Sequence, residues 1–167
     1  SLSLFDFKRG AKLSGNGFPL YIGKGAELER KLINAMLDYH IQNFGFKEIL
    51  PSVLINKKSM QTTGQLPKFQ DDMYHTEVDN LYLAPTAEVP ITSFHRNEIL
   101  SESDLPLKYV GYTPCFRRES GSYGKDTRGL LRVHQFNKVE LVEFTTPEQS
   151  FDQLEALTLQ AETVLQR

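Results

Sequence analysis

Two stretches of the chain decide the fold: residues 107–119 (LKYVGYTPCFRRE) and residues 130–144 (LLRVHQFNKVELVEF). Both have the alternation and the aromatic and β-branched residues that are typical of strands. The loop between them, residues 120–129 (SGSYGKDTRG), is rich in glycine and polar residues. The two stretches therefore predict one long antiparallel hairpin.

Helices are predicted both before and after this hairpin in the sequence. Upstream, apolar residues recur at three- and four-residue spacing over residues 26–44, which indicates an amphipathic helix: Leu28, Leu32, Ala35, Met36, Tyr39 and Phe44. Gly45 is placed to end that helix as a left-handed cap, and residues 46–50 read as a strand. Downstream, residues 147–166 predict a helix with Thr146 as its cap and Pro147 at its first position.

The remaining segments are assigned more coarsely. The first 25 residues, with their glycines and mixed polarity, predict strands and turns. Residues 56–63 predict a short helix, residues 73–75 and 80–84 predict strands, and residues 86–96 predict another helix. Strands and helices without regular alternation indicate the α+β class, with an antiparallel sheet flanked by helices.

Composition limits the kinds of partner. The chain has 167 residues, 40% of them hydrophobic, which suits one domain spanning residues 1–167. It has 19 basic and 21 acidic residues, so its net charge of −2 excludes gripping nucleic acid by an overall positive field. The lone cysteine, Cys115, excludes a disulfide framework and suits the cytoplasm, and no apolar run is long enough to span a membrane.

One face of the predicted hairpin has the residue types of a nucleotide site. Residues two apart in a strand share a face, which groups Arg117 with Glu119 on the first strand. On the second strand the same rule groups Arg132, His134, Phe136, Lys138 and Glu140. Arginines match phosphate oxygens, and an aromatic ring can stack on a purine. Alternation alone equally fits a solvated, charged sheet face.

Motif spacing favours the nucleotide site. Phe116-Arg117-Arg118-Glu119, followed by Arg132-x-x-x-Phe136-x-x-x-Glu140, resembles the second signature motif of class II aminoacyl-tRNA synthetases. The resemblance implies that Arg117 is catalytic and holds the α-phosphate of ATP and the amino acid carboxylate. It places Glu119 at the adenine end, Arg132 at the γ-phosphate and Phe136 against adenine, with Arg118 and Val133 completing the ATP-binding set.

Three further segments, residues 62–69, 83–90 and 124–136, resemble the seryl-tRNA synthetase family. This resemblance implies ATP-driven activation of serine and its transfer to tRNA(Ser), with Mg²⁺ arriving with ATP and no protein-bound metal. The implied serine-binding residues are Thr86, Ala87, Glu88, Arg117 and Glu140, and the implied contacts with the tRNA acceptor end are Ser120, Lys125 and Arg128. Thr86 and Glu88 also suit the plain roles of helix cap and first-turn acid.

The same resemblance extends to assembly and domain content. Residues 26–51 resemble the first class II motif, which implies a homodimer through that segment, although they also fit an ordinary core-facing helix. We expect the family's amino-terminal coiled-coil arm and its third motif to lie outside this chain, which makes it a partial catalytic domain. Two alternatives stay open: amino acid activation for a carrier protein, and a non-catalytic fragment that binds ATP or tRNA.

Overall fold

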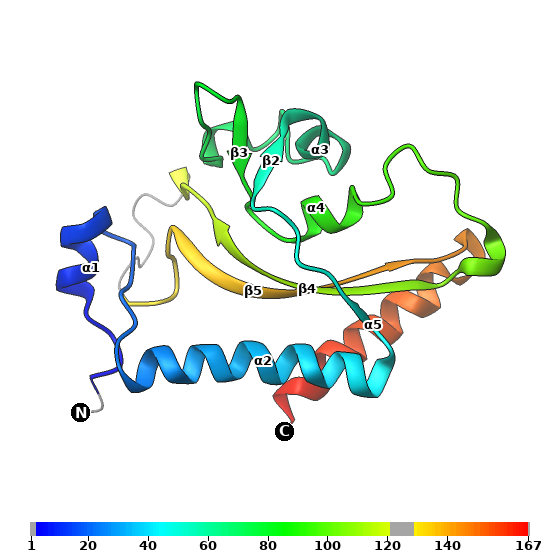
Figure 1. Ribbon diagram of the computed structural model, residues 1–167, viewed down its shortest axis with the longest axis horizontal. Helices are drawn as coiled ribbons and strands as arrows, with labels where there is room; N and C mark the ends of the chain where they lie inside the picture. The colour runs from blue at the N-terminus through cyan, green and yellow to red at the C-terminus, as the bar shows by residue number, and fades with distance from the viewer. Residues whose placement is uncertain (1–2, 121–128, 167) are drawn as a thin grey trace.

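A long antiparallel hairpin forms the centre of the molecule (Figure 1). The computed structural model describes residues 3–120 and 129–166. Strand β4 (Leu107–Phe116) pairs with β5 (Gln135–Phe144), from Leu107 opposite Phe144 to Phe116 opposite Gln135. The short strand β1 (Lys47–Glu48) lies parallel to β4 on its other side, which gives the order β1-β4-β5. The predicted hairpin is confirmed, but its second strand begins at Gln135 and not at residue 130.

Each face of this sheet has its own apolar core. Helices α2 (Lys24–Phe44) and α5 (Ser150–Leu165) cover one face, where Leu37, Phe46 and Val110 are buried (Figure 1). Helix α4 (Glu88–Thr92) packs on the other face through Ile91, which is buried with Tyr109. The α+β class is therefore confirmed, with helices on both sides of the sheet.

A small second sheet sits above α4. It pairs β2 (Leu54–Asn56) with β3 (Leu81–Leu83) in antiparallel fashion, and α3 (Lys57–Thr62) follows β2 directly. Its core is made of buried residues from strand, helix and loop: Ile55, Met60, Leu66, Met73, Tyr82, Ala84 and Val89. Because Val89 belongs to α4, this core connects the small sheet to the helix that lies on the hairpin.

The predicted helices are found, although the one predicted over 86–96 is much shorter than expected. Gly45 ends α2 in the left-handed conformation, with φ of 71°, as expected for a glycine cap. Asn56 caps α3 by accepting a hydrogen bond from the Ser59 amide. The last helix begins with a 3₁₀ turn, Pro147–Gln149, and the Thr146 side chain makes no capping hydrogen bond there. In residues 3–120 and 129–166, no helix is long and apolar enough to cross a membrane.

The prediction for the amino-terminal segment was wrong, because it contains helix α1 (Phe7–Ser14). Asp6 begins this helix by accepting a hydrogen bond from the Arg9 amide. Gly10 had suggested a turn, but it lies in the helix where a Cβ atom would come within 2.2 Å of the Phe18 carbonyl oxygen. Its role is to let the helix approach the following segment, which local sequence does not reveal.

Several predicted elements are shorter than expected. The helix predicted over 86–96 covers only α4, and β1 keeps two residues of the predicted 46–50 strand. Of residues 73–75, only His75 makes a β-bridge, with Tyr82, and 3₁₀ turns occupy Gln70–Asp72 and Glu102–Asp104. The first hairpin strand ends at Phe116, and Glu119 has φ of 51°, which is incompatible with an extended strand.

Gly111 allows α4 to approach the hairpin closely. A Cβ atom at this position would lie 2.8 Å from the Ile49 carbonyl oxygen and 2.8 Å from Cδ1 of Ile91. Such distances are shorter than van der Waals contact, so any side chain here would push α4 away from β4. The site described below depends on this approach, because Gly111 is the residue opposite Glu140.

We predict that Gly111→Ala lowers the free energy of unfolding by about 1–3 kcal/mol, the usual cost of overpacking. Urea unfolding measures this change. The matched control is the double variant with Ile91→Val, which removes Cδ1 and should recover part of the loss. Equal stability of Gly111→Ala and the unsubstituted protein would contradict the packing described here.

Candidate active site

The end of strand β4 is held against the segment that leads into α4. The Phe116 amide donates to the Ala84 carbonyl at 2.9 Å, and Arg117 Nε donates to the Pro85 carbonyl at 3.1 Å. The Arg117 guanidinium also lies over the Phe136 ring, 5.1 Å from its centroid. These contacts fix Arg117 through one of its nitrogens and one face of its plane, between the two strands and the α4 segment.

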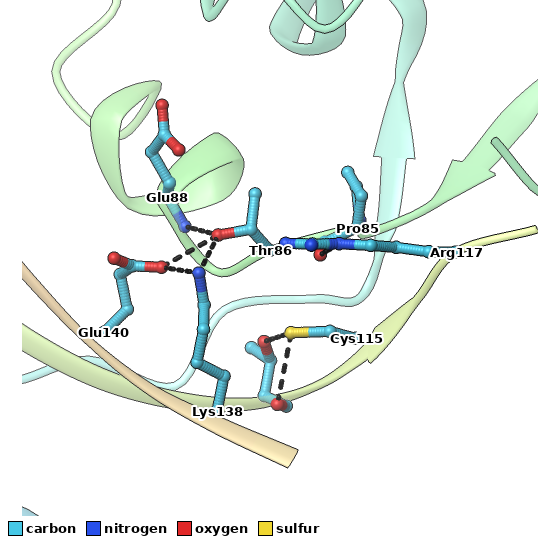
Figure 2. A network of polar contacts seen from close by, with 8 residues as sticks. Pro85, Thr86, Glu88, Cys115, Arg117, Lys138 and Glu140 are labelled. Carbon is cyan, nitrogen blue, oxygen red and sulfur yellow. Dashed lines mark hydrogen bonds and ion pairs between the residues drawn. The ribbon is translucent and has the colours of Figure 1, made fainter. Parts of the chain in front are cut away.

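Thr86, Lys138 and Glu140 form a polar network next to Arg117 (Figure 2). The Thr86 hydroxyl donates to Glu140 Oε2 at 2.8 Å, and it accepts from Lys138 Nζ at 2.6 Å and from the Glu88 amide at 3.1 Å. Lys138 and Glu140 also form an ion pair. Thr86 is buried, whereas Glu88 is exposed, so its carboxylate is open to solvent beside the network.

Two cavities meet at Arg117. One, of about 380 Å³, is lined on the hairpin and α4 side by Pro85, Thr86, Glu88, Arg117 and Lys138, and on the loop side by Gln65, Phe69, Asp72 and Met73. The other, of about 570 Å³, is lined by Leu130, Leu131, Val133 and Phe136. Arg117, Glu119 and Arg132 line both. A ligand with a small polar end and a flat aromatic end could therefore occupy both cavities across Arg117.

The boundary between the cavities carries a charged pair. Arg132 Nη1 donates to Glu119 Oε2 at 2.9 Å, across the position where the two chain segments leave the regular hairpin. The Arg117 amide donates to the His134 carbonyl at 2.9 Å, so the pairing continues one residue past the end of β4 and one residue before the start of β5. Glu119 and Arg132 lie beyond this pairing, outside the extended strands that the alternation predicted, and their side-chain contact brings them together next to Arg117.

Asp72 ties the start of the hairpin loop to the small-sheet side. Its carboxylate accepts hydrogen bonds from the Ser120 hydroxyl at 2.5 Å and the Ser120 amide at 2.7 Å. These two bonds hold the pKa of the Asp72 carboxyl below its usual value. Asp72 is therefore a charged acceptor at neutral pH; it lines the smaller cavity and holds Ser120 through two hydrogen bonds.

Other predicted residues lie elsewhere. Arg118 is exposed, and its guanidinium lies over the Tyr74 ring at 5.9 Å, outside the residues that line either cavity. Ala87 is fully buried under α4. His134 packs its ring on Phe18 at 5.1 Å. Lys125 and Arg128 lie outside the described residues.

Sequence reasoning gave no role to Lys138 and Asp72. The alternation had placed Lys138 between Phe136 and Glu140 on the same strand face, and this position was the only sign in the sequence that Lys138 belongs to the site. Asp72 is brought in from a loop 48 residues before Ser120 in the chain, and no local pattern marks such a contact. Cys115 is also close to the site, but burial raises the pKa of its thiol, so it remains protonated at neutral pH. Within the described ranges, no group of three or more His, Cys, Asp or Glu side chains is arranged to hold a metal ion.

The chain is similar in sequence and fold to known proteins. The serine–tRNA ligase of Chlorobium phaeobacteroides (strain DSM 266) is 61% identical over 166 residues, which are 99% of this chain and 38% of that protein. The chain thus spans well under half the length of the curated relatives it matches.

Two solved structures have the same fold over 99% of this chain. Seryl-tRNA synthetase from Pyrococcus horikoshii, complexed with ATP, has a TM-score of 0.94 and 41% identity, with 37% of its chain covered. Cytoplasmic serine–tRNA ligase from Naegleria fowleri, in complex with AMP, has a TM-score of 0.92 and 31% identity, with 39% covered. A family model for the tRNA synthetase class II core domain (G, H, P, S and T) matches residues 69–167. Because that match covers more than half of the chain, the chain belongs to the family of class II tRNA synthetase core domains.

Proposed function

We propose that this chain supplies the ATP and serine sites of a serine–tRNA ligase. The reaction joins the serine carboxylate to the α-phosphate of ATP, releases pyrophosphate, and then passes serine to the terminal adenosine of tRNA(Ser). The observation that carries the proposal is the position of Arg117, which lies between the Phe136 ring and the Thr86–Lys138–Glu140 network and lines both cavities. The ATP and AMP complexes of the two similar structures support it.

The larger cavity is the proposed ATP site. Adenine would stack on Phe136 near Val133 and Glu119, and the triphosphate would bend toward Arg132. Arg117 would neutralise the charge that develops on the α-phosphate, and Arg118 would add a more distant positive charge. No covalent enzyme intermediate is needed, because fixed geometry and fixed charge lower the barrier. We propose that Mg²⁺ arrives bound to the phosphates of ATP.

The smaller cavity is the proposed serine site. Thr86 and Ala87 lead directly into α4, and Glu88 is its first residue. The start of a helix is a rigid place for the Glu88 carboxylate, which would bind the serine ammonium group. Glu140 would accept a hydrogen bond from the serine hydroxyl. An amino acid without the hydroxyl would cover this acceptor without pairing it, at a cost of about 1–3 kcal/mol. Arg117 would hold the serine carboxylate next to the α-phosphate.

Ser120, Lys125 and Arg128 are proposed to contact the acceptor end of tRNA(Ser), with the two basic residues at phosphates. Ser120 is bonded to Asp72, which lines the smaller cavity, and this contact supports an approach from this side. Consistent with such a role, we propose that the protein works in the cytoplasm, where translation takes place.

An apolar surface on α2 supports the proposed homodimer through residues 26–51. Leu28 and Leu32 are 49% and 45% exposed on the helix side that faces away from the sheet, and Ala35 continues the stripe. The inward side of the same helix is filled by Ile33, Leu37, Ile41 and Phe44. A helix that has apolar residues on both sides fits the core on one side and a twofold partner on the other.

We predict that Arg117→Ala, made in the full-length protein that contains this chain, slows serine-dependent pyrophosphate exchange by at least about 10²–10³-fold. Arg117→Lys should restore little, because a point charge cannot hold a phosphate and a carboxylate in one plane. The control is Arg9→Ala, which removes an arginine whose side chain is 77% exposed on α1. Near-normal exchange by Arg117→Ala, with an unchanged melting curve, would contradict the proposed ATP site.

We predict that Leu32→Glu converts the full-length protein from dimer to monomer at micromolar concentration, because it places a charge in the apolar stripe. Sedimentation velocity measures the change. The control is Asn34→Glu, which adds the same charge at an exposed position of α2 outside the stripe. A monomeric unsubstituted protein, or a Leu32→Glu dimer as tight as the control, would refute this interface.

A further inference from the structure

Lys138 occupies a position that the reaction scheme above leaves without a role. It projects from β5 on the face that carries Phe136 and Glu140, and it lines the smaller cavity. Its side chain is 31% exposed, and its ammonium group contacts two proposed serine-binding residues at once: the Thr86 hydroxyl at 2.6 Å, and the Glu140 carboxylate. Figure 2 shows Lys138 reaching the junction between Thr86 and Glu140.

The hydrogen bonds at Thr86 determine where its proton points. A hydroxyl has one proton to donate and two lone pairs to accept with. Lys138 Nζ and the Glu88 amide are donors, and they occupy both lone pairs. The hydroxyl proton is therefore directed to Glu140 Oε2, at 2.8 Å. With Lys138 in place, the Thr86 hydroxyl can donate only to Glu140 and therefore holds that carboxylate in position.

The same arrangement leaves one oxygen of Glu140 for a ligand. Oε2 receives both the Thr86 hydroxyl and the Lys138 ammonium group. In the part of the chain that the structure describes, Oε1 has no hydrogen-bond partner, and the side chain is 21% exposed, so this oxygen is accessible. The carboxylate is held by its other oxygen, which fixes the direction of its free lone pairs.

Glu140 and Glu88 differ in whether their negative charge is compensated. Lys138 compensates the charge of Glu140 through their ion pair. Glu88 contributes only its backbone amide to the network, and its exposed carboxylate has no ion-pair partner among the described residues. Glu88 thus keeps an uncompensated negative charge for a substrate ammonium group, whereas Glu140 presents a fixed acceptor.

We infer that Lys138 is a specificity-determining positioning residue, which orients Glu140 through Thr86 so that Oε1 accepts the hydroxyl of the substrate amino acid. This inference rests on the proposed serine site. It assigns the preference for a hydroxyl-bearing side chain to the pair Lys138–Glu140 and not to Glu140 alone. Without the ammonium group, Thr86 can turn its proton elsewhere and Glu140 can rotate, so the acceptor loses its fixed direction.

The test compares serine and alanine in pyrophosphate exchange by the full-length protein and its Lys138→Met variant. We expect the preference for serine over alanine to fall at least about tenfold, because the variant loses the oriented hydrogen bond that only serine uses. The loss should lie in KM for serine, and KM for ATP should change less than about twofold. Lys138→Arg, which keeps the charge, should recover part of the preference.

Lys108→Met is the matched control. Lys108 also pairs with a glutamate on the neighbouring strand, Glu143 at 3.3 Å, but on the sheet face that packs against α2. Its loss should lower the melting temperature without changing the ratio of serine to alanine. If Lys138→Met behaves in the same way, Lys138 has only a structural role and the inference is overturned. If Lys138→Met does not fold, the preference for serine over alanine is measured with Lys138→Gln instead, and the same criterion applies.

The outcome for the unsubstituted protein separates the two claims. If it shows no serine-dependent exchange, the proposed function itself fails, and the inference falls with it. If exchange is normal but Lys138→Met keeps the full preference for serine, only the role of Lys138 is wrong.

Discussion

The close packing of residues 84–92 on the β4–β5 hairpin is the constraint on which the candidate site depends. Gly111 leaves room for Ile91, the Phe116 amide and Arg117 Nε bond to the carbonyls of Ala84 and Pro85, and Thr86 reaches Glu140, 54 residues further along the chain. Thr86 and Glu88 come from the segment at the start of α4, whereas Arg117, Lys138 and Glu140 come from the hairpin. Neither segment forms the site alone. The two become one site because backbone contacts set their distance before any ligand is present.

Arg117 connects the two halves of this arrangement. It is anchored to Pro85 through Nε and stacked on Phe136, and it lines both cavities. A guanidinium held in this way has lost much of its conformational freedom before a substrate binds, which reduces the entropy cost of binding and of the reaction. Lys138 has a comparable effect in the smaller cavity, where it limits the hydrogen-bonding choices of Thr86 and Glu140. Charged groups held in fixed positions are thus a feature that the two cavities have in common.

Alternation in the sequence was sufficient to predict the hairpin, because strand periodicity is local. It did not account for Glu119 and Arg132, which lie beyond the paired strands. The amphipathic pattern likewise predicted α2, and Gly45 predicted its end. The sequence pattern could not reveal which side of α2 is inward, because Leu32 and Leu37 are both apolar but only Leu37 is buried. It also missed α1, where Gly10 serves a tertiary contact, and the link between Asp72 and Ser120. These failures share one cause: each depends on a contact between segments that are separated in the chain.

The most direct test of this site is a crystal structure of the full-length protein with a non-hydrolysable analogue of seryl-adenylate, such as the seryl sulfamate of adenosine. We predict that adenine stacks on Phe136, that the sulfamate lies against Arg117, and that the serine hydroxyl binds Glu140 Oε1 while its ammonium group lies next to Glu88. An analogue bound away from the β4–β5 hairpin, or bound with its seryl group in the cavity at Phe136, would contradict the site described here.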